Sequence, residues 1–222
     1  MLISITFDDG YISQLKFAKL LAQLGIRATF FIITHLKSFE SKQLLTINEE
    51  NIATLVEMGH EVGSHTATHE ILIKLDRFKL EEELKSSKRY LEDIIGREVL
   101  GFAYPYGIYN LRVIREVSKH YYYARATDIL PFDDPLNIKV WSKYTIGSAS
   151  VKTIGKVLLY AMNPTFSSYI KPTVFIHDVK PVKAAMLYSL IHVLRKLDAK
   201  FLTMKELAEI IEGECGECEG CS

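Results

Sequence analysis

The stretch ISITFDDG, residues 3–10, decides how the rest of the chain is interpreted. Its first five residues are β-branched, aromatic or hydroxyl-bearing, which predicts a buried strand. Two adjacent aspartates, Asp8 and Asp9, and then a glycine follow without a break. Neighbouring carboxylates repel each other unless a cation or hydrogen-bond donors compensate for their charge. The stretch therefore ends either in an ordinary turn or in one half of an active site.

Strand-like and helix-like segments alternate along the chain. We expect strands at 2–7, 28–33, 60–65, 99–104, 121–127, 173–177 and 200–203, and helices at 12–25, 46–58, 77–96, 110–119, 150–162, 183–197 and 203–212. About seven such units with short connections predict an α/β fold with a parallel sheet and right-handed crossovers. At 222 residues we favour a closed or nearly closed barrel over an open sheet, which periodicity alone does not separate.

Local signals mark several helix ends. Thr46 followed by Glu49 fits a capping box at the start of the helix 46–58. Gly25, Gly59 and Gly96 fit the position just after a helix.

The overall composition narrows the classes of partner. Twenty-seven basic residues balance twenty-seven acidic ones, so we expect neither nucleic acid nor a membrane surface as a partner. The sequence shows no membrane-spanning apolar run and no signal-peptide pattern, which makes a cytoplasmic location the expectation. Composition does not predict the oligomeric state.

The cysteines are confined to the end of the chain. Cys215, Cys218 and Cys221 lie in a tail, 213–222, that follows the single domain expected over 1–212. The spacing C-x-x-C-x-x-C suits a metal but gives only three ligands, so we favour a flexible tail with reactive thiols.

Polar clusters follow four of the expected strands. They are the aspartate pair, HTATH at 65–69, PYG at 105–107 and HD at 177–178. In a parallel barrel the carboxyl ends of the strands lie on one rim, where barrel active sites are built. Four reactive clusters that are far apart in sequence should therefore meet in space.

The histidines of the second cluster predict a metal site. His65 and His69 have the spacing H-x-x-x-H, which on a helix or tight turn places two imidazoles on one side. Two histidines and one carboxylate suit catalytic zinc, although the same set can hold iron. One aspartate of the pair would bind the ion and the other would accept a proton from water, and the spacing leaves open which does which.

The remaining clusters supply candidates for the other steps of a hydrolysis. His177, at the end of a late strand, is a candidate general acid. Backbone N–H groups of the turn at 105–107 could donate to an oxyanion.

Together these motifs resemble the polysaccharide deacetylases, the NodB-homology domain of the family-4 carbohydrate esterases. TFDDG, SHTATH, YPYG and FIH resemble the first, second, third and fifth motifs of that family, over residues 2 to about 210. The resemblance implies a distorted (β/α)7 TIM-like barrel and metal-dependent hydrolysis of a non-peptide amide, usually an N-acetyl group on a sugar. It implies Zn²⁺ as the usual ion, with Co²⁺, Ni²⁺, Mn²⁺ or Fe²⁺ as other choices.

The resemblance also assigns the site residues. By position, Asp8 is the catalytic base, and the metal ligands are Asp9, His65 and His69. The Tyr106 backbone N–H contributes to the oxyanion hole, and His177 is the general acid.

Two departures from the family pattern bear on the base and the acid. Where the third motif often has an arginine that contacts the base, this chain has Ala103, and we expect Arg125, at the end of the fifth strand, to supply the missing guanidinium. The fourth motif usually supplies an aspartate that orients the acid, but no Asp-Trp pair is present. Asp128 and, more weakly, Asp178 are the candidates for that role.

These departures keep other functions open. The same site could hydrolyse a small non-sugar amide or a cyclic imide or ureide, in a closed pocket lined by aromatics such as Phe132 and Trp141. A barrel that only binds carbohydrate is the non-enzymatic alternative.

Overall fold

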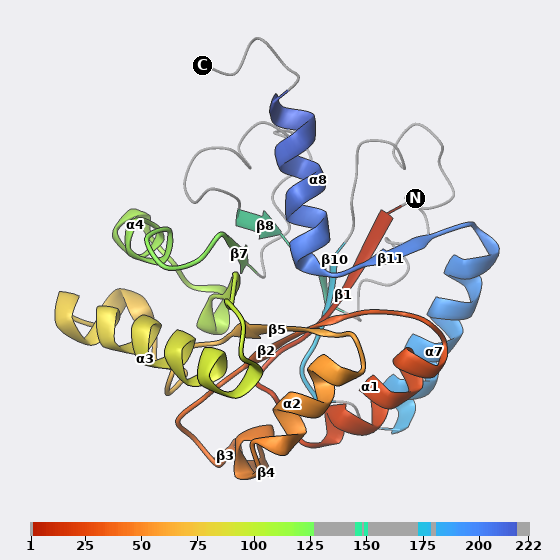
Figure 1. Ribbon diagram of the computed structural model, residues 1–222, viewed down its shortest axis with the longest axis horizontal. Helices are drawn as coiled ribbons and strands as arrows, with labels where there is room; N and C mark the ends of the chain where they lie inside the picture. Colours follow the sequence, from red (N-terminus) through yellow and green to blue (C-terminus); the bar gives the residue numbers. More distant parts are fainter. Residues whose placement is uncertain (1, 127–144, 148, 151–172, 179–180, 217–222) are drawn as a thin grey trace.

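A curled parallel sheet forms the centre of the protein (Figure 1). The computed structural model describes residues 2–126, 145–147, 149–150, 173–178 and 181–216. Its sheet strands are β1 (Leu2–Phe7), β2 (Thr29–Ile32), β5 (Glu61–Ser64), β6 (Gly101–Ala103), β7 (Tyr123–Ala126), β8 (Thr145–Gly147), β9 (Ala149–Ser150), β10 (Thr173–Ile176) and β11 (Lys200–Leu202). The helices are α1 (Ser13–Gln23), α2 (Glu50–Glu57), α3 (Arg77–Ile95), α4 (Leu111–Val117), α7 (Pro181–Lys196) and α8 (Met204–Gly216), with 3₁₀ turns η1 (Leu45–Ile47), η2 (Leu72–Lys74) and η3 (Pro105–Gly107).

The strand order describes a distorted (β/α)7 barrel, as the sequence predicted. The order is β8-β7-β6-β5-β2-β1-β10-β9, every pairing in it is parallel, and β11 adds to β1 outside this path. β8 and β9 stand at opposite ends of the order but only one residue apart in the chain. They therefore occupy one position between β7 and β10, which makes seven positions around the barrel.

The alternation of β1 divides its side chains between two environments. Ile3, Ile5 and Phe7 belong to the main apolar core with α1, where Phe7 stacks on Phe30 with ring centroids 4.6 Å apart. Because successive side chains point to opposite faces of a strand, Ser4, Thr6 and Asp8 point to the other side, the barrel interior. Asp8 is thus delivered to the interior at the carboxyl end of the strand.

Helix α8 closes the other end of the barrel. Its residues Met204, Leu207 and Ala208 form a buried cluster with Phe31, Ala103 and Tyr123. At the start of α8 the Lys205 N–H donates to the Glu61 carboxylate (2.9 Å), which also accepts from the Thr29 and Tyr123 hydroxyls (2.8 Å each). Burial raises the pKa of Glu61, and these hydrogen bonds offset only part of that rise.

Several local expectations need correction. The capping box is wrong: Thr46 lies in η1 and donates to the Leu36 carbonyl, and α2 begins only at Glu50. The glycines do follow the helices, with left-handed φ of 68°, 84° and 66° at Gly25, Gly59 and Gly96. The sequence did not predict the small hairpin of β3 (Ser38–Phe39) and β4 (Lys42–Gln43).

Two expected helices of the second half of the chain differ from the expectation or lie mostly outside the described residues. α8 runs four residues past the expected helix end at 212, into the segment assigned to the tail. The expected helix 150–162 lies outside the described residues, except that Ser150 belongs to β9.

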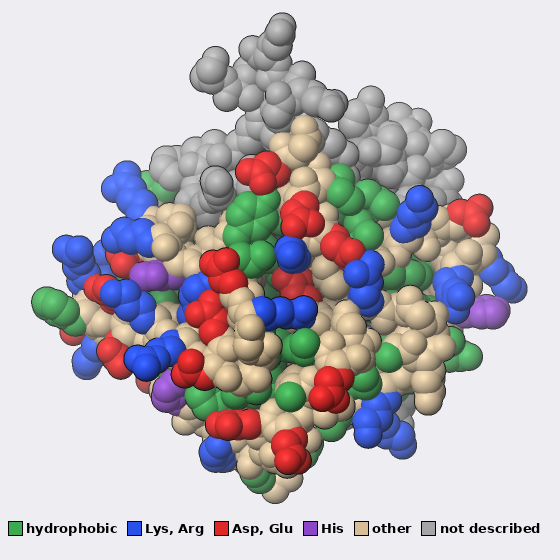
Figure 2. Space-filling view, in the orientation of Figure 1, with side chains coloured by type: hydrophobic (Ala, Val, Ile, Leu, Met, Phe, Trp, Pro, Cys, Tyr) green, Lys and Arg blue, Asp and Glu red, His purple; other side chains and the backbone are tan. Residues whose placement is uncertain are grey.

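The surface agrees with the balanced charge. On the face seen in Figure 2, basic and acidic side chains are interspersed, and neither sign covers a large continuous area. In the part of the chain that the structure describes, no helix is both long and apolar enough to cross a bilayer.

Candidate metal centre and catalytic site

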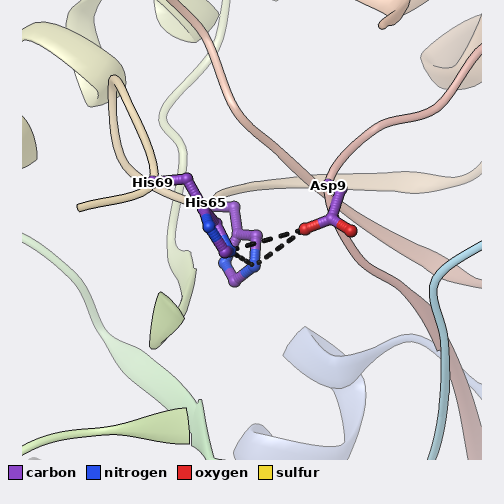
Figure 3. Close-up of side chains that lie close together, drawn as sticks. All are labelled: Asp9, His65 and His69. Atoms are coloured by element: carbon purple, nitrogen blue, oxygen red, sulfur yellow. Dashed lines mark hydrogen bonds and ion pairs between the residues drawn. The ribbon is translucent and has the colours of Figure 1, made fainter. Parts of the chain in front are cut away.

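The three predicted metal ligands converge at the carboxyl ends of the strands. Asp9 follows β1, while His65 and His69 belong to the turn that follows β5, and all three are buried (Figure 3). The two histidine Nε2 atoms lie 3.1 Å apart, and each is 3.5 Å from Asp9 Oδ1. A four-coordinate ion with bonds of about 2.0–2.1 Å needs neighbouring ligand atoms roughly 3.3–3.4 Å apart. The spacing of these three atoms therefore fits one small dication.

The hydrogen bond of His65 and the pKa values of His69 and Asp9 also favour a bound dication. The Nδ1 of His65 donates to the Ala103 carbonyl (2.8 Å), so in the neutral ring Nε2 keeps its lone pair for a ligand bond. Burial and the charge of His65 lower the pKa of His69 to about 3, against the opposing charge of Asp9, so His69 stays neutral. Burial alone would raise the pKa of Asp9, but the nearby histidines outweigh it and lower that pKa. The neutral imidazole of His69, the Nε2 atom of His65 and the Asp9 carboxylate together form the donor set that a zinc-like ion needs.

The backbone around the site is strained in a way that aims these ligands. Asp9, Thr66, His69 and Tyr106 all have left-handed φ, between 57° and 69°. The His69 N–H donates to Thr66 Oγ1 (2.9 Å), which closes the turn between the histidines. Such conformations cost about 1–3 kcal/mol each and persist only where the surroundings hold them. The predicted H-x-x-x-H pair thus lies on a tight turn and not on a helix.

Asp8 lies against a buried arginine. Arg125 Nη2 donates to Asp8 Oδ1 (2.8 Å), and Arg125 is fully buried. Its guanidinium carbon lies 5.4 Å from the ring centroid of Phe31 and 5.3 Å from that of Phe175. The expected contact between Arg125 and Asp8 is therefore present in the structure.

The register of the sheet explains how Arg125 reaches Asp8. Arg125 of β7 is paired with Ala103 of β6. Paired residues on neighbouring strands point to the same face of the sheet. Because the side chain of Ala103 is small, it leaves room in the barrel interior for the side chain of Arg125. The guanidinium comes from the strand beside the one that carries it in the family pattern.

His177 lies near the other carboxylate oxygen of Asp8, the one that Arg125 does not bind. Its Nε2 is 3.8 Å from Asp8 Oδ2, and its side chain is 49% exposed, which leaves it open to a substrate. Asp178 does not orient it: that carboxylate accepts from Ser13 (3.0 Å) and pairs with Lys42 (3.5 Å), so this expectation is wrong.

Asp128, Phe132 and Trp141 lie outside the described residues, as do Cys218 and Cys221 of the tail.

The turn at 105–107 lies beside the metal ligands. Tyr106 packs its ring against His69 with centroids 4.5 Å apart and is 54% exposed. The Gly107 and Ile108 N–H groups donate within the turn, to Tyr104 and Pro105. The Tyr106 N–H is the remaining candidate from this turn for an oxyanion hole.

A family model covers the first three of the four motifs, TFDDG, SHTATH and YPYG. Residues 1–124, more than half of the chain, match the model of the polysaccharide deacetylases. The chain belongs to the polysaccharide deacetylase family. A peptidoglycan-N-acetylglucosamine deacetylase of Bacillus cereus is 31% identical over 122 residues, which cover 53% of this chain and 52% of the relative. The chain spans about half, or less, of the length of the curated relatives that it matches.

Solved structures share the fold of this deacetylase-family chain. A deacetylase solved with substrate superposes with a TM-score of 0.65 at 18% identity, over 93% of this chain and 89% of that chain. A family-4 pseudoenzyme from Bacillus anthracis superposes with a TM-score of 0.64 at 17% identity, over 93% of this chain and 65% of that chain. At these identities the likeness establishes the barrel and not the activity.

The sequence did not reveal two residues that hold this deacetylase-type site together. The Gln14 amide donates to the backbone carbonyls of both Asp8 and His177 (2.6 Å each). A signal for Gln14 was available, because it lies on the buried face of α1 with Phe17, Ala18 and Leu21. No such signal marks Glu83, the third of three consecutive glutamates in α3, which binds the turn that carries the histidines.

Proposed function

We propose that the protein is a metal-dependent hydrolase of carbon–nitrogen bonds that removes the acetyl group from an N-acetylated sugar or polysaccharide. The observation that carries the proposal is one buried cluster: a metal-sized Asp9–His65–His69 triad beside an arginine-bound Asp8 and a half-exposed His177. Family membership and the shared barrel support it.

The triad would hold the ion. We propose Zn²⁺, since two neutral histidines and a carboxylate are a usual zinc set, with Co²⁺, Ni²⁺, Mn²⁺ or Fe²⁺ as substitutes. When bound, the dication would polarise the amide carbonyl and make water a better nucleophile at neutral pH.

Residues of the chain would transfer the protons and stabilise the negative charge that develops on the carbonyl oxygen. Asp8 would accept the proton of the attacking water, and the hydrogen bond from Arg125 would hold Asp8 correctly oriented for that step. The Tyr106 N–H would donate to the oxyanion of the tetrahedral species. His177, on the open side of Asp8, would give its proton to the departing amine.

One structural observation removes a reason for the first alternative, a small non-sugar amide. The missing arginine at 103 was a reason to consider small amides or cyclic ureides, but Arg125 places a guanidinium on the base from the next strand. The presence of base, ligands and acid in one cluster argues against the binding-only alternative.

A substrate panel tests the proposal. Protein loaded with Zn²⁺ is incubated with N-acetylglucosamine oligomers and, separately, with cyclic ureides and simple acetamides, and acetate and amine are quantified. We expect acetate from the N-acetylated sugars, and none from them with Asp9→Ala. Turnover confined to ureides or acetamides would overturn the sugar assignment, and no turnover of any compound would favour the binding-only alternative.

A further inference from the structure

A carboxylate from the neighbouring helix holds the turn that carries both histidines. Glu83 Oε2 accepts hydrogen bonds from the Ala67 and Thr68 backbone N–H groups (2.9 Å each). Glu83 Oε1 accepts from the Thr68 hydroxyl (2.5 Å). One side chain thus makes three hydrogen bonds to the two residues midway between the metal ligands.

The shape of the turn explains why it needs such an acceptor. The left-handed Thr66 turns successive N–H groups toward one side, an arrangement that binds anions. Backbone donors in a partly buried turn are costly when they lack an acceptor. The Glu83 carboxylate takes the place of that anion, and it stabilises the strained turn.

Helix α3, which carries Glu83, is held firmly against the sheet. Leu80, Leu84 and Leu91 of α3 are buried in the main core, and Ser87 hydrogen-bonds Ser64 of β5 (2.7 Å between the hydroxyl oxygens). The turn is therefore tied through Glu83 to a 19-residue helix that is itself packed on the sheet.

The two histidines depend on the turn to different degrees. His65 is oriented by its own hydrogen bond to the Ala103 carbonyl. The buried Nδ1 of His69 has no hydrogen-bond partner among the described residues. The direction of the His69 ring is thus set by its backbone and by the rings of Phe39 and Tyr106 that pack on it, with centroids 4.6 and 4.5 Å away.

We infer that Glu83 is a positioning residue that sets the affinity of the metal site by fixing His69 relative to His65. The inference rests on the proposed metal site and adds a residue outside the motifs that define it. Removal of groups that orient metal ligands typically weakens metal binding about 10- to 100-fold.

The test measures Zn²⁺ affinity directly, without turnover. Metal-free wild type, Glu83→Ala and Glu83→Gln are titrated with Zn²⁺ against a chromophoric chelator, and thermal unfolding of each metal-free form is recorded. Glu82→Ala is the matched control, because Glu82 is the exposed neighbour on the same helix. We expect Glu83→Ala to weaken Zn²⁺ binding about 10- to 100-fold, Glu82→Ala to leave it unchanged, and Glu83→Gln, whose amide oxygen still accepts, to recover most of the loss.

The outcomes separate this inference from the proposed function. A folded Glu83→Ala protein that binds Zn²⁺ as tightly as wild type overturns the role of Glu83 and leaves the metal site standing. A wild type that binds no Zn²⁺ overturns both. If Glu83→Ala does not fold, Thr68→Val removes only the hydroxyl hydrogen bond, and we expect a smaller weakening of Zn²⁺ binding; unchanged affinity there overturns the inference.

Discussion

Replacement of Arg125 should slow catalysis without changing substrate affinity. Arg125→Met keeps a chain of similar length between the rings of Phe31 and Phe175 but removes the 2.8 Å charge-assisted hydrogen bond to Asp8. Such bonds contribute about 1.5–3 kcal/mol. If that energy is used to hold the base in the transition state, kcat should fall about 10- to 150-fold, since about 1.4 kcal/mol corresponds to a factor of ten.

Stability should fall as well, because the partner charge stays buried. Arg125 and Asp8 are both at most 1% exposed. Removal of one member of a buried pair typically costs about 3–5 kcal/mol, since it leaves an uncompensated charge. Chemical denaturation should therefore show a lower free energy of unfolding for Arg125→Met. Arg89→Met, at a side chain that is 86% exposed, is the control that should change neither quantity.

A double substitution separates the chemical role from the structural one. Because Ala103 and Arg125 are register partners, Ala103→Arg combined with Arg125→Ala moves the guanidinium to the adjacent strand on the same face. We expect kcat of the double variant to recover well above that of Arg125→Ala alone. Steady-state kinetics with an N-acetylated oligosaccharide measure kcat and KM for each protein. A folded Arg125→Met enzyme with kcat within twofold of wild type would refute the reasoning.

Three further predictions test the supports of the site and the fold. Gln14→Met removes the donor to the backbone carbonyls of Asp8 and His177 and should lower kcat, while Zn²⁺ affinity measured by chelator competition stays unchanged. A parallel loss of Zn²⁺ affinity would contradict a role confined to the catalytic base and the general acid. Thr66→Val keeps the left-handed, β-branched residue but loses the acceptor for the His69 N–H, so it should cost about 1–2 kcal/mol in denaturant unfolding, whereas Thr66→Ser should not. Burial raises the pKa of Glu61, so the folded chain holds that proton to higher pH than the unfolded chain, and ionisation costs stability as pH rises above 4.5. Glu61→Gln, which stays neutral, should gain unfolding free energy relative to wild type over that range, and a difference independent of pH would count against this account.

Alternating strand and helix segments, the chain length and the family resemblance together predicted the barrel, and the motifs predicted the location of its site. The alternation of β1 places Asp8 in the interior, and parallel strands end on one rim, so Asp9 and the two histidines had to approach one another. Arg125 could also be predicted, because the position next to it in the sheet lacks the usual arginine.

The parts that the sequence did not predict depend on contacts between distant side chains and backbone. Glu83 looks like any exposed helix glutamate until α3 is docked against the histidine turn. The capping-box pattern at Thr46 failed because a tertiary acceptor, the Leu36 carbonyl, took its hydroxyl. Asp178 is close in sequence to His177 yet pairs with Ser13 and Lys42, because a strand end directs successive side chains to opposite sides.

The most direct test of the central claim is a Zn²⁺ titration of metal-free protein, with acetate release from an N-acetylated oligosaccharide measured at each step. It is run on wild type and on Asp8→Asn, which keeps the three ligands Asp9, His65 and His69. We predict that wild-type activity rises from near zero and saturates at one Zn²⁺ per chain, while Asp8→Asn binds one Zn²⁺ with little change in affinity and releases no acetate. Wild-type turnover that persists without metal, or full turnover by Asp8→Asn, would contradict the account.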